Sequence, residues 1–421
     1  MATTLSEDLH SLLSDPGRPP VWDLVIVGSG YGGAMAAAEL SKRGDKGRPL
    51  DILLLERGRE WRNGAFPERL AELPGELRLG SQSDGRVRGK AEGLYDLRVG
   101  PDCNLLLANG LGGGSLINAG VLLPPDPEDF APGPLKTRLK EIHATSLVEV
   151  AQRLGVQGVE GSALPKVQAL QRLGTEATTL MPLSIAQQAG PNAAGVRLEA
   201  CTNCGNCLSG CNVGAKDSLD LNLLREARSR GVRMVCGASV LRLERSRRRW
   251  RLQLVHTDPA QQARRGAPLQ LLAHQVVLAA GSLGSTEILL RSRSDSLAFS
   301  ARLGMGFSGN GDSLGFAMDL PEPADARADE HDDPRSPAKP VGSTISGAIK
   351  LTAKQGRPFW VQEFAVPGAL RRLHDELATT LDLLHRLPEG DCSRHGGELP
   401  GSPDPLAVDD EACRRSLVLG L

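Results

Sequence analysis

The feature that most restricts the fold of this chain is a glycine-rich turn between an apolar segment and an alanine-rich segment. Residues 21–27 read VWDLVIV, which predicts a buried parallel strand. Residues 28–33 then read GSGYGG, and residues 34–44, AMAAAELSKRG, predict a helix. A second apolar strand is predicted at 51–55, with Glu56 at its end. This order of strand, turn, helix, strand and acid is typical of an α/β fold that binds a dinucleotide.

Each glycine of the turn has a physical role in such a fold. Gly28 permits the tight turn, Gly30 lets the backbone approach a pyrophosphate, and Gly33 lets helix and strand pack closely. The N-terminus of the following helix offers free N–H groups to the phosphates. Glu56 follows Gly33 by 23 positions, close to the roughly 20 expected for an acid that binds a ribose diol, and it argues against a 2′-phosphate. These residues do not separate FAD from NAD.

Length and composition exclude several classes of function. The chain has 421 residues, enough for two or three domains. Its 49 Lys and Arg and 50 Asp and Glu leave a net charge of -1, so there is no basic excess to bind nucleic acid. Residues 1–20 lack the pattern of a signal peptide, and no stretch reaches the roughly 20 apolar residues of a membrane span. We expect a cytoplasmic protein with no transmembrane segment.

Four later segments extend the pattern. Residues 109–120 read NGLGGGSLINAG, whose successive glycine N–H groups can form a nest for anionic or carbonyl groups, although an ordinary glycine-rich turn is the alternative. Residues 275–290 read QVVLAAGSLGSTEILL, a second junction of strand, glycine and helix. Before that junction, residues 232–256 alternate as a β-meander. Residues 307–316 read FSGNGDSLGF.

These segments, in this order, resemble the glucose–methanol–choline (GMC) oxidoreductase family, in particular its cholesterol-oxidase-like branch, over residues 21–316. The resemblance implies FAD as the cofactor, with the glycine-rich loop along the flavin and a strand near Val240 passing the adenine. It also implies an α/β fold (α+β overall), with a Rossmann-like FAD/NAD(P)-binding domain and a second, sheet-containing substrate domain. The expected cofactor-binding residues are Gly28, Gly30, Tyr31, Gly32, Gly33, Glu56, Gly114, Ser115, Asn118, Val240 and Gly281.

The resemblance also implies a reaction and a division of the chain. In such a protein an alcohol CH–OH loses a hydride to flavin N5 while a histidine takes the hydroxyl proton. The expected substrate is a sterol such as cholesterol or another bulky alcohol, and the electrons go to O2 or to a redox partner. The predicted domains are an N-terminal tail (1–17), a discontinuous FAD-binding domain (18–130 and 231–315), an insertion with a cysteine run (131–230) and a partial substrate domain (316–421).

The cysteine run is the second unusual feature of the sequence. Cys201, Cys204, Cys207 and Cys211 have the spacing Cx2Cx2Cx3C, by which bacterial ferredoxins hold iron–sulfur clusters. Asn212 stands where ferredoxins place proline, and the sequence has no second run. The run leads to the hypothesis of a 4Fe–4S or 3Fe–4S cluster, held by four or by three cysteines. A zinc site and metal-free cysteines are the alternatives, although four-cysteine zinc sites prefer two separated pairs.

The chain departs from the family pattern in its later part. GMC proteins usually carry a catalytic histidine in a segment of His-Pro-Leu-Gly-Gly character, followed by a strand that covers the flavin. His395 resembles that segment only superficially, and a surface position is the favoured interpretation. Glu363 is a weak candidate for a catalytic base, with a surface acid on a strand as the favoured interpretation. Asp217 stands where the resemblance leads us to expect asparagine.

The apolar residues 416–421 read SLVLGL, typical of a core strand cut short. The chain therefore resembles the family without its C-terminal part. Two alternatives to a sterol oxidoreductase stay open. One is an iron–sulfur-linked dehydrogenase for a sugar or small alcohol. The other is a truncated, catalytically inactive flavin-binding remnant.

Overall fold

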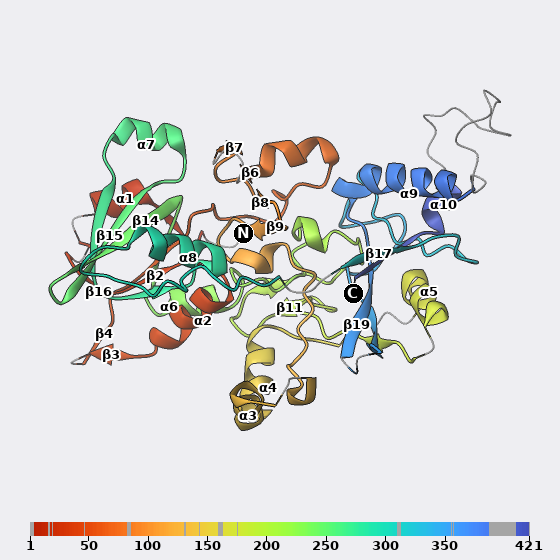
Figure 1. Ribbon diagram of the computed structural model, residues 1–421, viewed down its shortest axis with the longest axis horizontal. Helices are drawn as coiled ribbons and strands as arrows, with labels where there is room; N and C mark the ends of the chain where they lie inside the picture. The colour runs from red at the N-terminus through yellow and green to blue at the C-terminus, as the bar shows by residue number, and fades with distance from the viewer. Residues whose placement is uncertain are drawn as a thin grey trace.

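The computed structural model describes residues 4–386 and 410–420, apart from 16, 19, 46, 82–85, 130, 131, 143, 159–162, 175, 310–312, 355 and 357. Figure 1 shows a sheet near each end of an elongated molecule, with irregular segments and short helices between them. The α/β class with a second, sheet-containing part is confirmed.

The larger sheet has seven strands and joins segments that are far apart in the sequence. Neighbouring strands from β1 to β16 pair in parallel, and β16, β15 and β14 form the antiparallel meander that the sequence predicts. The strands predicted at 21–27 and 51–55 lie side by side as β2 and β5. The order across the sheet is β1 (Glu7–Asp8), β13 (Arg233–Cys236), β5 (Ile52–Leu55), β2 (Trp22–Val27), β16 (Leu269–Leu278), β15 (Arg249–His256) and β14 (Ala238–Ser246).

Both faces of this sheet are covered, which explains why β2 and β5 are apolar at almost every position. Helices α2 (Tyr31–Leu40) and α6 (Leu223–Ser229) share one core with one set of alternating side chains. Helices α1 (Leu9–Ser14) and α8 (Gly281–Arg291) share a core with the other set. Helix α2 begins three residues earlier than predicted, because the last residues of the glycine motif already form its first turn.

The smaller sheet has five antiparallel strands and includes the end of the described chain. Its order is β10 (Thr179–Leu180), β18 (Gly347–Thr352), β19 (Pro358–Phe364), β20 (Leu417–Gly420) and β17 (Leu314–Ala317). The terminal apolar run is therefore a strand with a neighbour on each side, and Leu417 is fully buried. Helix α5 (Pro165–Leu173) packs against β18 and β19.

The remaining strands and α-helices lie outside these two sheets. The strands form one four-stranded sheet and two two-stranded sheets, and the helices are short apart from one of 16 residues. These remaining elements are β3 (Gly44–Asp45), β4 (Arg48–Pro49), β6 (Leu77–Ser81), β7 (Val87–Gly89), β8 (Tyr95–Val99), β9 (Asn104–Ala108), β11 (Gly190–Pro191), β12 (Arg197–Leu198), α3 (Pro134–Glu141), α4 (Ala144–Arg153), α7 (Pro259–Arg265), α9 (Arg371–Arg386) and α10 (Asp410–Arg414).

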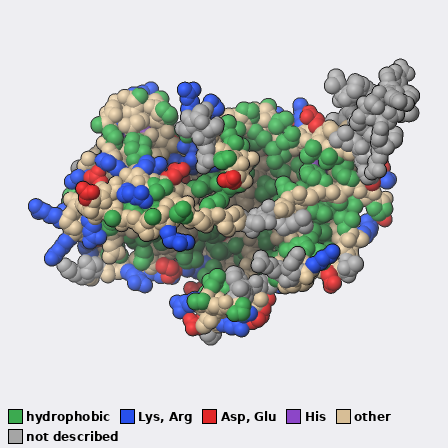
Figure 2. Space-filling model, in the orientation of Figure 1, with side chains coloured by type: hydrophobic (Ala, Val, Ile, Leu, Met, Phe, Trp, Pro, Cys, Tyr) green, Lys and Arg blue, Asp and Glu red, His purple; other side chains and the backbone are tan. Residues whose placement is uncertain are grey.

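The surface mixes charged and apolar side chains. Figure 2 shows acidic and basic side chains interspersed over one face, with hydrophobic side chains gathered beside a hollow near its middle. Exposed apolar residues occur on and just before β17: Met305, Phe307, Leu314 and Phe316. Among the residues that the structure describes, no helix combines the length and the apolar character needed to cross a membrane.

Candidate functional site: two glycine loops beside a cysteine pocket

The two junctions of strand, glycine and helix lie next to each other. Strands β2 and β16 pair in parallel up to Val27 and Leu278, so their carboxyl ends meet at one edge of the sheet. Helices α2 and α8 begin at this edge, directly after those ends, and each presents its N-terminus there. Gly28 has φ +98° and Gly281 has φ +72°, a backbone region that favours glycine. The edge is therefore suited to bind an anionic group.

The three glycines of the first motif differ in what surrounds them. A Cβ on Gly28 would lie 2.4 Å from the carbonyl oxygen of Ala279, and one on Gly33 would lie 1.9 Å from that of Gly28. These two glycines are therefore needed for backbone packing. Around Gly30, in contrast, no heavy atom lies within 4 Å of a built Cβ. Its backbone faces open space, as expected of the position that a pyrophosphate approaches.

The second glycine loop contacts the first one. A Cβ on Gly113 would lie 2.8 Å from the Cα of Gly30, so only glycine permits this approach. Asn118 Nδ2 donates a hydrogen bond to the Tyr31 hydroxyl at 2.9 Å. Gly114 faces open space like Gly30. The structure thus brings together four residues that the sequence predicts to bind the cofactor, Gly30, Tyr31, Gly114 and Asn118.

Ser115 and Val240 have a different setting. The Ser115 hydroxyl is buried, donates to the Gly112 carbonyl at 2.8 Å and accepts from the Leu219 N–H at 3.0 Å. Its side chain therefore fixes the shape of the loop. The Val240 side chain is buried in the core of the large sheet, beside a β-bulge in β14. A direct contact of either residue with FAD stays a prediction.

Glu56 lies at the carboxyl end of β5, where the sequence predicts a ribose-binding acid. Its carboxylate accepts from the Ser29 hydroxyl at 2.5 Å and from the Gly58 N–H at 2.8 Å. The Ser29 N–H also donates to this carboxylate, at 3.2 Å. A carboxylate has about four acceptor positions, so one remains for a ribose hydroxyl. The Ser29 hydroxyl also accepts from the Gly112 N–H at 3.0 Å, which joins both glycine loops to Glu56. The sequence analysis missed Ser29, because the second position of the motif has no fixed residue type.

The residues present fit the cofactor that the sequence analysis expects. Two glycines face open space, the two loops touch, and two helix N-termini lie at the same sheet edge. Each feature is what a bound pyrophosphate and a planar ring require. These residues are therefore compatible with the FAD site that the sequence analysis predicts.

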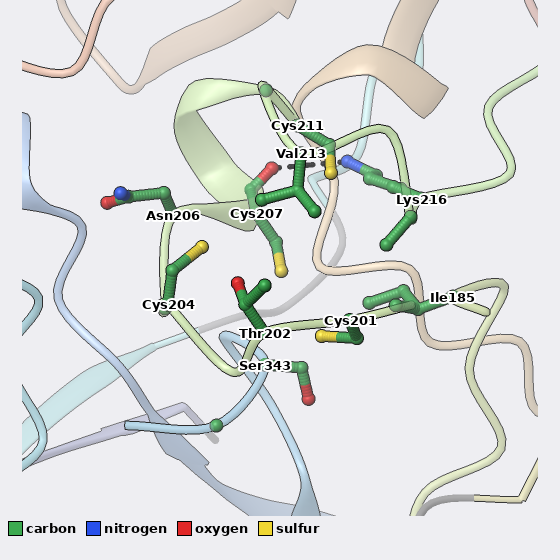
Figure 3. A pocket seen from close by; sticks show the side chains of 14 residues that line it. Ile185, Cys201, Thr202, Cys204, Asn206, Cys207, Cys211, Val213, Lys216 and Ser343 are labelled. Atoms are coloured by element: carbon green, nitrogen blue, oxygen red, sulfur yellow. Dashed lines mark hydrogen bonds between the residues drawn. The ribbon is translucent and has the colours of Figure 1, made fainter. Parts of the chain in front are cut away.

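The four cysteines of the run line one cavity of about 20 Å³, which is room for about one water molecule. Figure 3 shows the four side chains around this space, with Lys216 beside Cys207 and Cys211. The chain makes the necessary turns at Asn203, Gly205 and Gly210, which all have positive φ. The four members of the run are Cys201, Cys204, Cys207 and Cys211.

The protonation of these thiols depends on what fills the cavity. Burial, and then the neighbouring Cys207, raise the pKa of Cys201 and of Cys204 to about 12. Without a metal these two thiols are therefore protonated and unreactive. In the part of the chain that the structure describes, no group of three or more His, Cys, Asp or Glu side chains is arranged to hold a metal ion. The described residues therefore give no evidence for an iron–sulfur cluster or for zinc, and the metal site stays a prediction.

Two buried polar residues connect the cysteine run to its surroundings. Lys216 Nζ donates to the carbonyl oxygens of Leu116 at 3.1 Å, Asn118 at 2.5 Å and Cys207 at 3.2 Å. It therefore links the second glycine loop to the cysteine pocket. Asn212 accepts from the N–H groups of Gly64 and Phe66 through its side-chain oxygen. Proline, which ferredoxins have at this position, could not make these bonds.

Glu363 is not the surface acid that we expected. Its side chain is fully buried and forms an ion pair with Lys166, which is also fully buried. The other carboxylate oxygen accepts from the N–H groups of Ser346 and Gly347, each at 2.7 Å. Burial raises the pKa of Glu363, and the Lys166 charge opposes this rise. A group so enclosed fits a structural role better than that of a base that meets substrate. His395 lies outside the described residues.

Asp217, at the position where the resemblance leads us to expect asparagine, is buried, and its Oδ2 has no hydrogen-bond partner. Burial raises its pKa from 3.8 to about 6, although Asn192 donates to Oδ1 at 2.8 Å. Because the folded-state pKa lies above the unfolded one, this group stabilises the fold below pH 4, and the contribution is lost as pH rises through 6. A rise of roughly 2 units corresponds to roughly 3 kcal/mol.

We therefore expect Asp217→Asn to raise stability at pH 7.5 by up to about 3 kcal/mol and to change it little near pH 4. Urea unfolding at both pH values would measure the difference. Asp102→Asn, at an exposed position, is the matched control and should show no such difference between the two pH values. If the free energy of unfolding depended on pH in the same way in Asp217→Asn and in the wild type, the expectation would be contradicted.

Comparison with known proteins places these features in a family context. The family model described as GMC oxidoreductase matches residues 32–296. Cholesterol oxidase of Mycobacterium tuberculosis is 28% identical over 323 residues, which cover 70% of this chain and 52% of that protein. A GMC-type oxidoreductase of the same organism is 30% identical over 283 residues, which cover 64% of this chain and 39% of that protein.

Further matches have lower coverage or similarity. Cholesterol oxidase of Acinetobacter baumannii is 26% identical over 236 residues, covering 51% of this chain and 39% of that protein. The structure of a fungal aryl-alcohol oxidase aligns with a TM-score of 0.46 and 13% identity, covering 80% of this chain and 62% of that one. The chain spans about half the length, or less, of the curated relatives it matches.

Proposed function

Because the chain belongs to the GMC oxidoreductase family, we propose that it is an FAD-dependent oxidoreductase that acts on the CH–OH group of an alcohol. The observation that carries this proposal is the contact between the two glycine loops, joined by the hydrogen bond from Asn118 to Tyr31. Bound at these loops, FAD would supply a hydride acceptor for the alcohol carbon.

The chain's own residues have distinct tasks under this proposal. The open backbone at Gly30, at the N-terminus of α2, binds the pyrophosphate. Glu56, held in place by Ser29, accepts from a ribose hydroxyl. Gly114 and Asn118 line the flavin. The FAD-binding domain then comprises 18–130 and 231–315, and strands from both segments (β2 and β5 from the first, β13 to β16 from the second) share the seven-stranded sheet.

The substrate we propose is a sterol or another bulky alcohol. Two relatives from different organisms are named cholesterol oxidase. Exposed apolar side chains on and before β17, such as Phe307 and Phe316, offer an apolar surface for such a substrate. The electrons are passed to O2 or to a redox partner, and we place the protein in the cytoplasm.

The experiment that tests this proposal starts with the visible spectrum of the purified chain. Flavin absorption bands, with FAD released into the supernatant by acid, are expected. Anaerobic addition of cholesterol should then bleach the flavin bands, with glucose as a comparison substrate. Bound FAD that no alcohol bleaches would favour the inactive remnant, and a chain that binds no added FAD would overturn the proposal.

A second candidate function is an iron–sulfur-linked dehydrogenase for a sugar or small alcohol. The observation that favours it is that all four cysteines of the run line one cavity, beside the lysine that binds the second glycine loop. In a 4Fe–4S or 3Fe–4S cluster each cysteine ligates a different iron. The thiols therefore need not converge on one point, as they would for a single ion. Cluster absorption would mark this function, with reduction of artificial acceptors and little peroxide.

The cysteine ligands can be tested directly. We expect the wild type, after anaerobic incubation with ferrous iron and sulfide, to retain both, and Cys204→Ser to retain less than about half as much, because one thiolate ligand is lost. Cys103→Ser is the matched control, since Cys103 is exposed and does not line the cavity. Equal iron and sulfide content in Cys204→Ser and the wild type would contradict this assignment.

A further inference from the structure

Three arginine side chains from separate segments of the chain meet on one buried carboxylate. The side chain of Asp96, on β8, is 1% exposed. Its two oxygens accept from Arg57 at 2.8 Å, from Arg78 at 2.6 Å, and from two nitrogen atoms of Arg98 at 2.8 and 3.0 Å. In the described part of the chain, Asp96 is the only carboxylate that pairs with Arg57 or Arg78. The group therefore holds three positive charges against one buried negative charge.

A structural role alone does not explain this surplus of positive charge. Arg98 has a further acidic neighbour, Glu287 at 3.4 Å, but that pair is partly exposed and contributes little. Burial lowers the pKa of Arg78, and the positive charge of Arg57 lowers it further. Among the described residues the Arg78 guanidinium makes a single hydrogen bond, to Asp96, so most of its N–H groups are available. An anionic ligand with acceptor atoms would relieve the repulsion and use these donors.

The arginines lie beside the residues that bind the cofactor under the proposed function. Arg57 directly follows Glu56, and its Nε donates to Asn109 Oδ1, at the start of the second glycine loop, at 2.9 Å. Glu287, which contacts Arg98, lies on α8 within about two turns of the N-terminus at the sheet edge. The arginine group thus contacts three segments around the expected cofactor site: the end of β5, the second glycine loop and α8.

The order of the chemical groups in FAD decides which part of the cofactor would lie there. The pyrophosphate is followed by the adenosine ribose and then by adenine. With the pyrophosphate at Gly30 and the ribose at Glu56, the adenine would extend beyond Glu56, toward Arg57 and its neighbours. Adenine has ring nitrogens that accept hydrogen bonds and a flat face on which a guanidinium group can stack. The diphosphate supplies negative charge at the same end of the cofactor.

We propose that Arg57, Arg78 and Arg98 form the site for the adenosine diphosphate end of FAD, and that Asp96 holds them in position. The ligand supplies the negative charge that offsets the surplus positive charge of the arginines. This inference deepens the FAD-binding function proposed above and rests on it. It also names a ligand class, an adenine nucleotide with a diphosphate group, so that ADP by itself should bind to the apoprotein.

The experiment measures binding of ADP, FAD and FMN to the apoproteins of the wild type, Arg78→Met, Arg78→Lys and Arg98→Met. FMN lacks the adenosine and therefore reports the rest of the site. We expect both Met variants to bind ADP and FAD at least about tenfold more weakly and to bind FMN unchanged. Arg78→Lys keeps the charge without the planar fork and should lose less affinity. Arg172→Met removes an exposed cation on α5 and is the matched control, with unchanged binding of all three ligands.

Urea unfolding of the same apoproteins separates binding from folding. Each Met variant leaves two arginines paired with Asp96 and removes a cation that repels them. Its midpoint of unfolding should therefore equal or exceed that of the wild type. A lower midpoint, together with equal losses of ADP and FMN binding, would mean that the arginines only support the fold and would overturn the inference.

The failure of this inference and that of the proposed function are distinguishable. A wild type that binds neither FAD nor ADP overturns both. A wild type that binds FAD, with ADP and FAD affinities unchanged in both Met variants, overturns the inference alone. Should Arg78→Met not fold, Arg98→Met decides the matter, because Arg57 and Arg78 still pair with Asp96 in that variant.

Discussion

Replacing Gly30 by alanine is expected to weaken FAD binding by about 10- to 100-fold while the free energy of unfolding of the apoprotein changes by less than about 0.5 kcal/mol. The reason lies in the surroundings of this residue. No heavy atom lies within 4 Å of a Cβ built there, and its φ of -66° is ordinary for alanine. The apoprotein therefore accommodates the methyl group. The methyl group would occupy the space that the pyrophosphate needs.

Gly33→Ala should behave in the opposite way. Its Cβ would lie 1.9 Å from the Gly28 carbonyl oxygen, which is backbone and cannot move aside. We expect a loss of about 3 kcal/mol in the free energy of unfolding, with FAD binding impaired only as a consequence. Gly75→Ala, in open space away from the loops, is the control for both variants.

Two measurements separate these effects. Thermal unfolding of the apoproteins reports the fold, and titration with FAD, followed by flavin fluorescence, reports the site. Equal FAD affinity of Gly30→Ala and the wild type would place the pyrophosphate elsewhere. An apoprotein of Gly30→Ala as unstable as that of Gly33→Ala would mean that Gly30 is needed for packing.

Breaking the ion pair between Lys166 and Glu363 is expected to cost about 3–5 kcal/mol of stability, because either single substitution leaves an uncompensated buried charge. Both side chains are fully buried. Glu363→Gln keeps an oxygen for the N–H groups of Ser346 and Gly347 but leaves Lys166 unpaired. Lys166→Met leaves the carboxylate unpaired. The pair joins α5 to β19, so its loss weakens the smaller sheet.

The double variant Lys166→Met/Glu363→Gln is the informative measurement. With both charges removed, it should be more stable than either single variant, with a coupling energy of about 2–3 kcal/mol from urea unfolding. Arg172, on the same helix as Lys166, forms an exposed ion pair with Glu322. Arg172→Met breaks this pair and should cost less than about 1 kcal/mol of stability. Normal stability of Glu363→Gln together with lost alcohol oxidation would instead support the catalytic base that the sequence analysis considered.

Local pattern was enough to predict the cofactor-binding half of the large sheet. The apolar runs at 21–27 and 51–55, the glycine turn and the meander at 232–256 are confirmed as neighbouring strands and a turn of one sheet. These elements are specified by residues close in sequence, through side-chain periodicity and glycine conformation. The contact of Gly30 with Gly113 in the second loop was not predicted, because the sequence shows only the glycines that permit it.

Other features depend on contacts between residues far apart, and no local pattern predicts them. Glu363 looks like an exposed acid on a strand, yet a lysine 197 positions earlier makes it an internal ion pair. Ser29 and Lys216 have no distinctive neighbours in sequence, yet each joins loops about 80–100 residues apart. The apolar run 417–420 is a strand inside the smaller sheet only because β17 and β19 pair with it on either side.

The sequence by itself thus determined that this chain has strand, turn and helix elements suited to a dinucleotide, and where the four cysteines lie along the chain. Only the tertiary structure decided that the cysteines line one cavity, that this cavity adjoins the second glycine loop, and that a buried lysine lies between them. The physical reason is that periodicity and turn chemistry act over a few residues, whereas burial, and the charge balance it imposes, depends on every segment that packs around a site.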